Sequence, residues 1–241
     1  MNSSTKEKIP HKVDERQSLP VLYSLRNCPY AMRARMAIFK TKQIIQLRDI
    51  VLSNKPSEMI AASTKATVPV LVLADGSVID ESLAIMLWAL QQSDPNDLLH
   101  QKSHNTANNK NTLTAMLVLI AEFDTDFKSC LEQYKCAKRY QEDNVVECRI
   151  ACEQYLQRLE QRLTQHPFLM SDKESLTDIA LMPFIRQFAR VERQWYLQSP
   201  YPKVRQWLNN YLQSPMFTKV MAKYPLWLDN HEVVLFGDKQ H

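Results

Sequence analysis

The chain passes from an apolar, strand-like run into a helix at Cys28, and this junction limits the possible folds more than any other feature. Residues 19–25 are mostly apolar, Cys28 and Pro29 come shortly after, and residues 29–40 have the character of a helix. Proline suits the first helical position, so Cys28 is expected at the helix N-terminus. The unpaired N–H groups and the positive end of the helix dipole there favour thiolate over thiol. Because the thiolate is the nucleophilic form, Cys28 is a candidate for covalent chemistry.

The residues after Cys28 supply no second thiol. A two-cysteine redox site would have one three positions on, where this chain has Ala31. The resolving thiol must therefore come from elsewhere, and a small-molecule thiol is the simplest source. The competing interpretation is a small buried side chain, which is common for free cysteine. The Cys-Pro pair alone favours that interpretation, and the next sixty residues reverse the preference.

The first ninety residues predict an ordered alternation of strands and helices. Asp75-Gly76 between two β-branched runs is a strong hairpin signal. A β-α-β unit, a short helix, a hairpin and a covering helix together make a thioredoxin-like layer. The predicted strands are residues 20–25, 46–51, 67–73 and 78–79, and the predicted helices are residues 29–41, 55–62 and 83–92.

Pro69 stands inside a strand-like run, where it cannot donate a hydrogen bond to the ladder. A trans proline at a strand start is the ordinary interpretation. With the Cys28 junction upstream we instead predict a cis Val68–Pro69 bond, which would leave the N–H and C=O of Val68 free for a ligand.

Glu81 and Ser82 begin the last helix of this segment. A helix N-terminus with a serine hydroxyl favours an anion, and a glutamate can hold an ammonium group. A carboxylate and an ammonium on one carbon, as in a γ-glutamyl group, would suit this pair. Plain helix capping explains Ser82 equally well.

The composition bounds the remaining possibilities. A chain of 241 residues, 45% hydrophobic, can bury a core in one large or two small domains. Only two glycines are present, which excludes glycine-rich phosphate loops and dinucleotide fingerprints. The net charge of +4 is mild and does not favour nucleic-acid binding, and no apolar run is long enough to span a membrane. Five cysteines do not make a disulfide framework, so we expect the reducing cytoplasm.

The second half predicts a helical domain. Its apolar residues recur at helical spacing in two stripes, and Ser175 begins a very apolar helix with Asp178 placed to return a bond to its N–H. Further helices are expected at residues 202–211 and 216–223. The predicted stripes are Leu113, Met116, Leu117 and Ile120, and Ile150, Leu156, Leu159 and Leu163.

Two other groups of residues carry weaker expectations. His100 and His104 have a metal-like spacing, but they lie in a polar segment without a nearby acid or thiol, so we predict no metal site. Arg33 and Arg35 are expected on a solvated helix face, although either could favour the Cys28 thiolate.

Together these motifs resemble the glutathione transferase superfamily, particularly its omega-like, cysteine-active branch. The resemblance covers roughly residues 19–225. Each motif alone is weak, and their succession is fairly specific. The residues that carry it are Cys28-Pro29-Tyr30-Ala31, Arg33, Arg35, Lys55-Pro56, Val68-Pro69-Val70, Glu81-Ser82 and Ser175-Leu176-Thr177-Asp178-Ile179-Ala180.

The resemblance implies an α/β plus all-α fold, with an N-terminal thioredoxin-like domain and a C-terminal helical bundle domain. It also implies a homodimer. We expect a flexible tail at 1–18, the glutathione-binding domain at 19–92, a linker at 93–104, the helical domain at 105–225 and a C-terminal tail at 226–241.

The resemblance also implies the site. Cys28 would be the catalytic thiol and glutathione the co-substrate, with a small electrophile or disulfide as second substrate and neither nucleic acid nor membrane as partner. The family often has Pro and Gly before the Val-Pro pair, whereas residues 63–66 here read Ser-Thr-Lys-Ala. The expected glutathione contacts are Tyr30, Lys55 at the glycine end, Val68 and Pro69 along the cysteinyl part, and Glu81 and Ser82 at the γ-glutamyl end.

Two functions stay open on the sequence. The first is an enzyme that performs glutathione-dependent thiol transfer or reduction, with conjugation as a possible activity supported by Tyr23, Ser24 or Tyr30. The second is a non-catalytic binding or docking protein of the same fold, because a fold does not fix a function.

Overall fold

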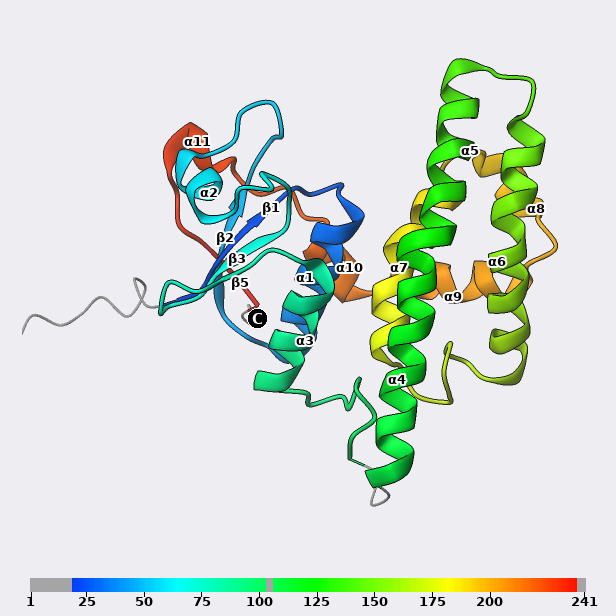
Figure 1. Ribbon diagram of the computed structural model, residues 1–241, viewed down its shortest axis with the longest axis horizontal. Helices are drawn as coiled ribbons and strands as arrows, with labels where there is room; N and C mark the ends of the chain where they lie inside the picture. Colours follow the sequence, from blue (N-terminus) through cyan, green and yellow to red (C-terminus); the bar gives the residue numbers. More distant parts are fainter. Residues whose placement is uncertain (1–18, 103–105, 238–241) are drawn as a thin grey trace, which may run out of the picture.

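The computed structural model describes residues 19–102 and 106–237, so the predicted tail at 1–18 and the side chain of His104 lie outside the described residues. The chain forms two lobes side by side, one built on a β-sheet and the other of helices only (Figure 1). The predicted fold class, α/β followed by all-α, is confirmed. None of the described helices is both long and apolar enough to cross a bilayer.

The sheet has five strands in the order β4-β3-β1-β2-β5. β1 and β2 are parallel, and the other neighbours are antiparallel. Leu22 in the central strand pairs with Leu47 on one side and Leu71 on the other. The strands are β1 (Val21–Ser24), β2 (Ile45–Asp49), β3 (Val70–Val72), β4 (Val78–Ile79) and β5 (Val234–Phe236).

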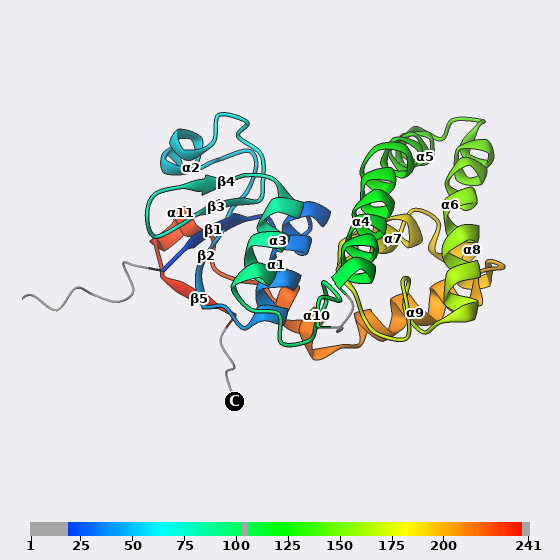
Figure 2. The same cartoon turned by 60° about the horizontal axis from the view of Figure 1, so that its bottom comes forward.

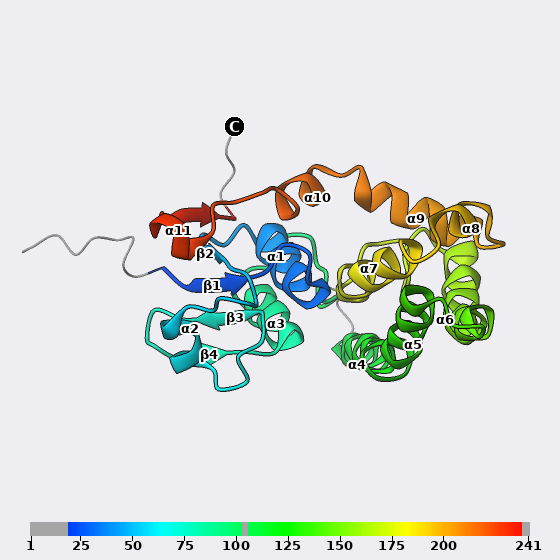
Figure 3. The ribbon, with the colours of Figure 1, turned by 90° about the horizontal axis from the view of Figure 1, so that it is seen from above.

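Three helices complete the predicted part of this lobe: α1 (Pro29–Thr41), α2 (Ser57–Ala62) and α3 (Ser82–Gln92). α1 and α3 pack against each other and lie between the sheet and the helical lobe, while α2 lies on the far side (Figure 3). α1 begins with Pro29 and ends at Thr41, and the next residue, Lys42, has the left-handed conformation. The helix can approach its neighbours closely because its inner face carries small side chains, the fully buried Ala31, Ala34 and Ala37.

The helical lobe surrounds α7, whose residues are almost all buried (Figure 2). Asp178 accepts from the N–H of Ser175 at 3.0 Å, as predicted. Ile150 does not lie in the core stripe: it is 53% exposed, and Cys152 takes the inward position. The elements are α4 (Thr106–Glu122), the π-helical turn η2 (Phe123–Phe127), α5 (Lys128–Tyr140), α6 (Val145–Gln165), α7 (Leu176–Ala189), α8 (Arg193–Gln198), α9 (Pro202–Leu212) and α10 (Pro215–Val220).

The prediction of a tail at 226–241 is wrong for the residues described up to 237. After α10, which packs on α1, the chain returns to the sheet, forms α11 (Trp227–Asn230) and adds β5 to the free edge of β2. Phe236 is fully buried there. Pairing with β2 satisfies backbone groups at a sheet edge, which local sequence patterns do not reveal.

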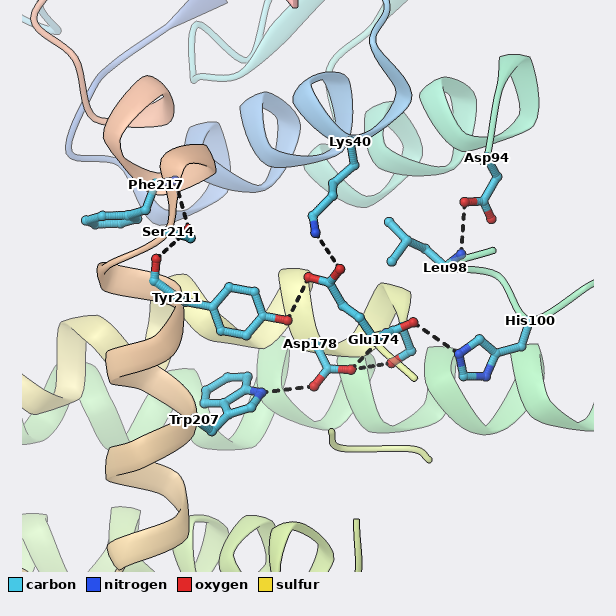
Figure 4. Close-up of polar contacts among 11 residues, drawn as sticks. Lys40, Asp94, Leu98, His100, Glu174, Asp178, Trp207, Tyr211, Ser214 and Phe217 are labelled. Atoms are coloured by element: carbon cyan, nitrogen blue, oxygen red, sulfur yellow. Dashed lines mark hydrogen bonds and ion pairs between the residues drawn. The ribbon is translucent and has the colours of Figure 1, made fainter. Parts of the chain in front are cut away.

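Polar contacts around Glu174 tie the two lobes together (Figure 4). Its carboxylate pairs with Lys40 of α1 and accepts from the Tyr211 hydroxyl of α9 at 2.8 Å. Its carbonyl lies 3.2 Å from a ring nitrogen of His100. His100 is thus occupied in a contact between segments, and no group of three or more potential metal ligands occurs within the described ranges.

Candidate functional site

Cys28 lies at the N-cap of α1, directly before Pro29. Its N–H donates to the carbonyl of Leu25 at 3.1 Å, and its own carbonyl accepts from the N–H of Met32 at 2.9 Å. The side chain is half-buried, and its Sγ lies 3.8 Å from the carbonyl oxygen of Val68. The thiol is therefore held at the positive end of α1 and faces a backbone segment forty residues away.

The Val68–Pro69 peptide bond is cis, as predicted. Val68 is 8% exposed and belongs to a small apolar cluster with Tyr23 and Met59, against which Cys28 packs. Met59 comes from α2, so this helix borders the same region. Lys55 lies in the loop just before α2 and is half-buried.

Arg35 orders the loop that carries Cys28. It donates to the hydroxyl of Ser24 at 2.7 Å and to the carbonyl of Arg26 at 2.6 Å, so one guanidinium holds the end of β1 and the following loop. Burial lowers the pKa of Arg35 to about 10, and the negative charge of Asp49 opposes this shift. The side chain stays charged at neutral pH and acts as a nearby cation.

The expectation that Arg33 and Arg35 lie on a solvated face is wrong, because their side chains are 0% and 1% exposed. Arg33 pairs with Asp124 and donates to the carbonyl of Ala180. Burial of two cations requires fixed partners. Those partners are distant in sequence, so spacing along α1 could not indicate them.

Glu81 and Ser82 begin α3 as predicted, with Glu81 at the N-cap and Ser82 buried. In this structure Lys65 donates to Glu81 at 2.6 Å and to Asp80 at 3.0 Å. Ser63 also donates to Asp80, at 2.7 Å. The loop at 63–66 is thus bonded to the start of α3, and hydrogen bonds from Ser63 and Lys65 lower the pKa of Asp80.

The three hydroxyls near Cys28 have different surroundings. The Tyr23 hydroxyl accepts from Arg48 at 2.6 Å, and that of Ser24 accepts from Arg35. The Tyr30 ring makes an edge contact with Phe184, with ring centres 5.1 Å apart, and the ammonium of Lys128 lies 5.4 Å from its centre. Tyr30 therefore faces the helical lobe.

A basic hollow of about 530 Å³ opens beside Asn27, the residue before Cys28. It lies against α5 and the C-terminal end of α7. Local sequence patterns do not indicate this hollow, because Asn27 lies more than a hundred residues before the two other segments that line it. Its charged lining residues are Glu132, Lys135, Lys138, Arg139, Arg186 and Arg190.

Comparison with known protein families identifies the same two-part organisation of the chain. Residues 22–97 match the family of the glutathione S-transferase N-terminal domain, and residues 137–210 match that of the C-terminal domain. Glutathione S-transferase omega-1 of Mus musculus is 25% identical over 209 residues, which cover 84% of this chain and 81% of that protein.

Known structures share the architecture. A glutathione transferase family member from Pseudomonas fluorescens, with two glutathione molecules bound, has a TM-score of 0.70 at 16% identity and covers 88% of this chain and 95% of its own. A glutathione S-transferase from Methylobacillus flagellatus, with glutathione bound, has a TM-score of 0.67 at 17% identity and covers 85% and 100%. The chain matches the N-terminal and C-terminal domain families of glutathione S-transferases in that order, and it shares their fold. It therefore belongs to the glutathione transferase superfamily.

Proposed function

We propose that this protein is an omega-like, cysteine-active glutathione transferase that transfers thiols or reduces mixed disulfides and electrophiles. The observation that carries the proposal is Cys28 at the N-cap of α1, with its Sγ 3.8 Å from the Val68 carbonyl beside a cis proline. Glutathione lying along Val68 would present its sulfur to Cys28 and its γ-glutamyl end to Glu81 and Ser82. The similarity to a mouse omega-class protein supports this assignment.

The reaction takes two exchange steps. The Cys28 thiolate attacks the glutathione sulfur of a mixed disulfide, forms a disulfide with glutathione, and releases the other half as a thiolate that takes up a proton. The thiolate of a second glutathione then attacks that bond, regenerates the Cys28 thiolate and leaves as oxidised glutathione. The released thiol is thereby reduced, and the second glutathione is the reductant that is oxidised. The second thiol comes from solution because position 31 is alanine.

We expect reduction rather than conjugation, because a protein thiol at the site would compete with a group that stabilises the thiolate of glutathione itself. Conjugation requires a hydroxyl that donates to that thiolate, and Tyr23, Ser24 and Tyr30 each offer one. Within the described residues their oxygens accept from Arg48, Arg35 and Lys128, which leaves the three O–H groups free to donate. We place the second substrate, an electrophile or disulfide, in the hollow beside Asn27.

One observation favours the alternative of a non-catalytic binding module. Lys65 occupies Glu81, the carboxylate that would hold the glutathione ammonium. Glutathione must displace this contact, and a chain in which it could not do so would keep the fold without the activity. The pair is exposed, so its strength is small and we give this alternative second place.

We also propose a cytoplasmic homodimer. All five cysteines are free, which suits a reducing compartment, and the dimer rests on superfamily membership alone. Light scattering of the purified protein tests the dimer directly.

The test of function is reduction of a glutathionylated peptide with glutathione as the reductant. The wild-type protein should reduce the peptide catalytically. Cys28→Ala should lose thiol transfer and still bind glutathione, because the expected γ-glutamyl contacts are made by Glu81 and Ser82. Cys148→Ala, which removes a half-buried cysteine of α6 that does not line the hollow beside Asn27, is the matched control and should keep full activity. Full activity in Cys28→Ala would show that the nucleophile is misassigned, and no turnover by wild type would favour the binding module.

A further inference from the structure

Helix α2 borders the proposed glutathione site, but its own residues anchor it weakly. All six of its residues are described, and among them only Met59 is buried. Its N-cap residue is Pro56, whose side chain offers no hydrogen-bond acceptor. An isolated helix of this length is not stable in water, so the position of α2 depends on contacts with other segments.

One of these contacts comes from the residues that follow α10. α11 lies beside α2 (Figure 1), and the indole N–H of Trp227 donates to Oε1 of Glu58 at 2.6 Å. The two residues are 169 positions apart in the chain. Glu58 is the second residue of α2, so this hydrogen bond reaches the first turn of the helix.

Arg48 of β2 completes the contact. Its guanidinium carbon lies 3.8 Å from the centre of the Trp227 ring, and its Nη1 lies 3.3 Å from the same oxygen of Glu58. The indole ring thus stacks on a cation while both residues approach one carboxylate. We call Trp227, Arg48 and Glu58 the Trp227 cluster.

The Trp227 cluster is connected to the surroundings of Cys28. Arg48 also donates to the Tyr23 hydroxyl at 2.6 Å. Tyr23, Met59 and Val68 belong to one buried apolar cluster, against which Cys28 packs. The same contacts that hold the first turn of α2 therefore meet the backbone segment that faces the thiol.

We propose that Trp227 is a positioning residue for glutathione, because it holds the first turn of α2 and, through that turn, the loop that carries Lys55. Lys55 lies three residues before Glu58 and is the expected contact of the glycine end of glutathione. The inference rests on the proposed function, which assigns this role to Lys55. Trp227 touches no substrate in this scheme and takes no part in the chemistry of Cys28.

Hydrogen exchange followed by mass spectrometry tests the positioning without any ligand. The exchange rates of the amides at 55–62 should rise about threefold or more in Trp227→Ala, while those of α1 should stay near wild type. Asp229→Asn, which changes an exposed residue of the same α11, is the control and should alter neither. Unchanged exchange at 55–62 in Trp227→Ala would overturn the inference, whether or not the protein binds glutathione.

Steady-state kinetics test the consequence for glutathione. Trp227→Phe keeps a ring for Arg48 but loses the N–H. It should raise the KM for glutathione about threefold and leave kcat within about twofold of wild type, a modest effect because the Glu58 side chain is 41% exposed. The rate at which iodoacetamide alkylates Cys28 should not change, and thermal unfolding checks folding.

The outcomes separate this inference from the function on which it rests. An unchanged KM, or a fall in kcat with slower alkylation of Cys28, would overturn the positioning role. Absence of glutathione binding by the wild type would overturn the proposed function instead, and hydrogen exchange would still decide whether Trp227 holds α2.

A double-mutant cycle shows whether Trp227 acts through Glu58. In a Glu58→Ala background, Trp227→Phe should change the KM for glutathione by less than about twofold, because the hydrogen bond is already lost. Glu58→Gln keeps an acceptor for the indole N–H and should lie between wild type and Glu58→Ala. Full additivity of the Trp227 and Glu58 substitutions would overturn the assignment.

Discussion

Arg33 of α1 and Asp124 of η2 form a two-point ion pair across the boundary between the lobes. Nη1 of Arg33 donates to Oδ2 at 2.9 Å, and Nη2 lies 2.7 Å from Oδ1. The same guanidinium donates through Nε to the carbonyl of Ala180 in α7 at 2.7 Å and lies 4.5 Å from the ring centre of Phe184. One fully buried side chain therefore joins the sheet lobe to two elements of the helical lobe.

Removing either partner should destabilise the protein strongly. Arg33→Met leaves the Asp124 carboxylate and the Ala180 carbonyl without their donor, and Asp124→Asn leaves a buried charge unpaired. We expect each to lower the free energy of unfolding by about 3–5 kcal/mol, measured by urea denaturation. Lys135→Gln, which breaks an exposed pair with Glu132, is the control and should cost about 0.5 kcal/mol or less. Losses below about 1 kcal/mol in both test variants would contradict this picture.

Cys28 should be the first cysteine that iodoacetamide alkylates near neutral pH. It is half-buried at a helix N-terminus with the Arg35 charge nearby, whereas burial raises the pKa of both Cys130 and Cys152. A time course followed by peptide mass spectrometry measures each site separately. Glutathione should protect Cys28 and leave the exposed Cys136 unprotected. Equal labelling rates at Cys28 and Cys136 would argue against an activated thiol.

Glu81 and Lys65 should affect glutathione binding in opposite directions. Glu81→Gln removes the expected partner of the ligand ammonium and should weaken binding by about tenfold. Lys65→Gln releases Glu81 from its present contact and should tighten binding slightly. Calorimetry measures both, and Lys223→Gln, an exposed lysine after α10, is the charge-matched control. Weaker binding in Lys65→Gln would instead mean that Lys65 contacts the ligand.

The C-terminal strand should contribute to folding stability through one residue. Phe236 is fully buried on the sheet, and neighbouring Leu235 is 37% exposed. Phe236→Ala should cost about 3–5 kcal/mol because it leaves a cavity, whereas Leu235→Ala should cost well under half as much. Thermal and urea unfolding of the two variants provide the comparison. Equal, small costs would indicate that β5 does not pair stably with β2.

Gly237 directly follows β5, and its backbone conformation and surroundings leave no room for a side chain. Its φ is +98°, and a side-chain carbon there would lie 1.7 Å from the carbonyl oxygen of Gln43. Gly237→Ala should therefore displace β5 and destabilise the protein. Gly76→Ala is the comparison, since that position also has positive φ but has no atom within 4 Å of the added carbon. The hydrogen-exchange rates of the β2 amides should rise in Gly237→Ala and remain near those of the wild type in Gly76→Ala.

Much of the sheet lobe was predictable because its signals are local. Pro29 marked the start of α1, and Asp75-Gly76 marked the turn between β3 and β4. In the helical lobe, Ser175 with Asp178 marked the start of α7 in the same way. The cis bond before Pro69 was predicted from a proline in a strand-like run. The errors fell where partners are remote, as with Ile150, whose exposure depends on which face of α6 meets its neighbours.

The sequence by itself therefore determined the order of helices and strands from β1 to α3 and the position of Cys28 at a helix N-terminus. These follow from turn chemistry, capping and hydrophobic period within a few residues. Only the tertiary structure decided that Arg33 is buried beside Asp124, that β5 closes the edge of β2, and that Lys65 reaches Glu81. Each of those depends on contacts between residues far apart in the sequence. The residues next to a charged or apolar side chain in the sequence do not indicate which distant residues it will contact.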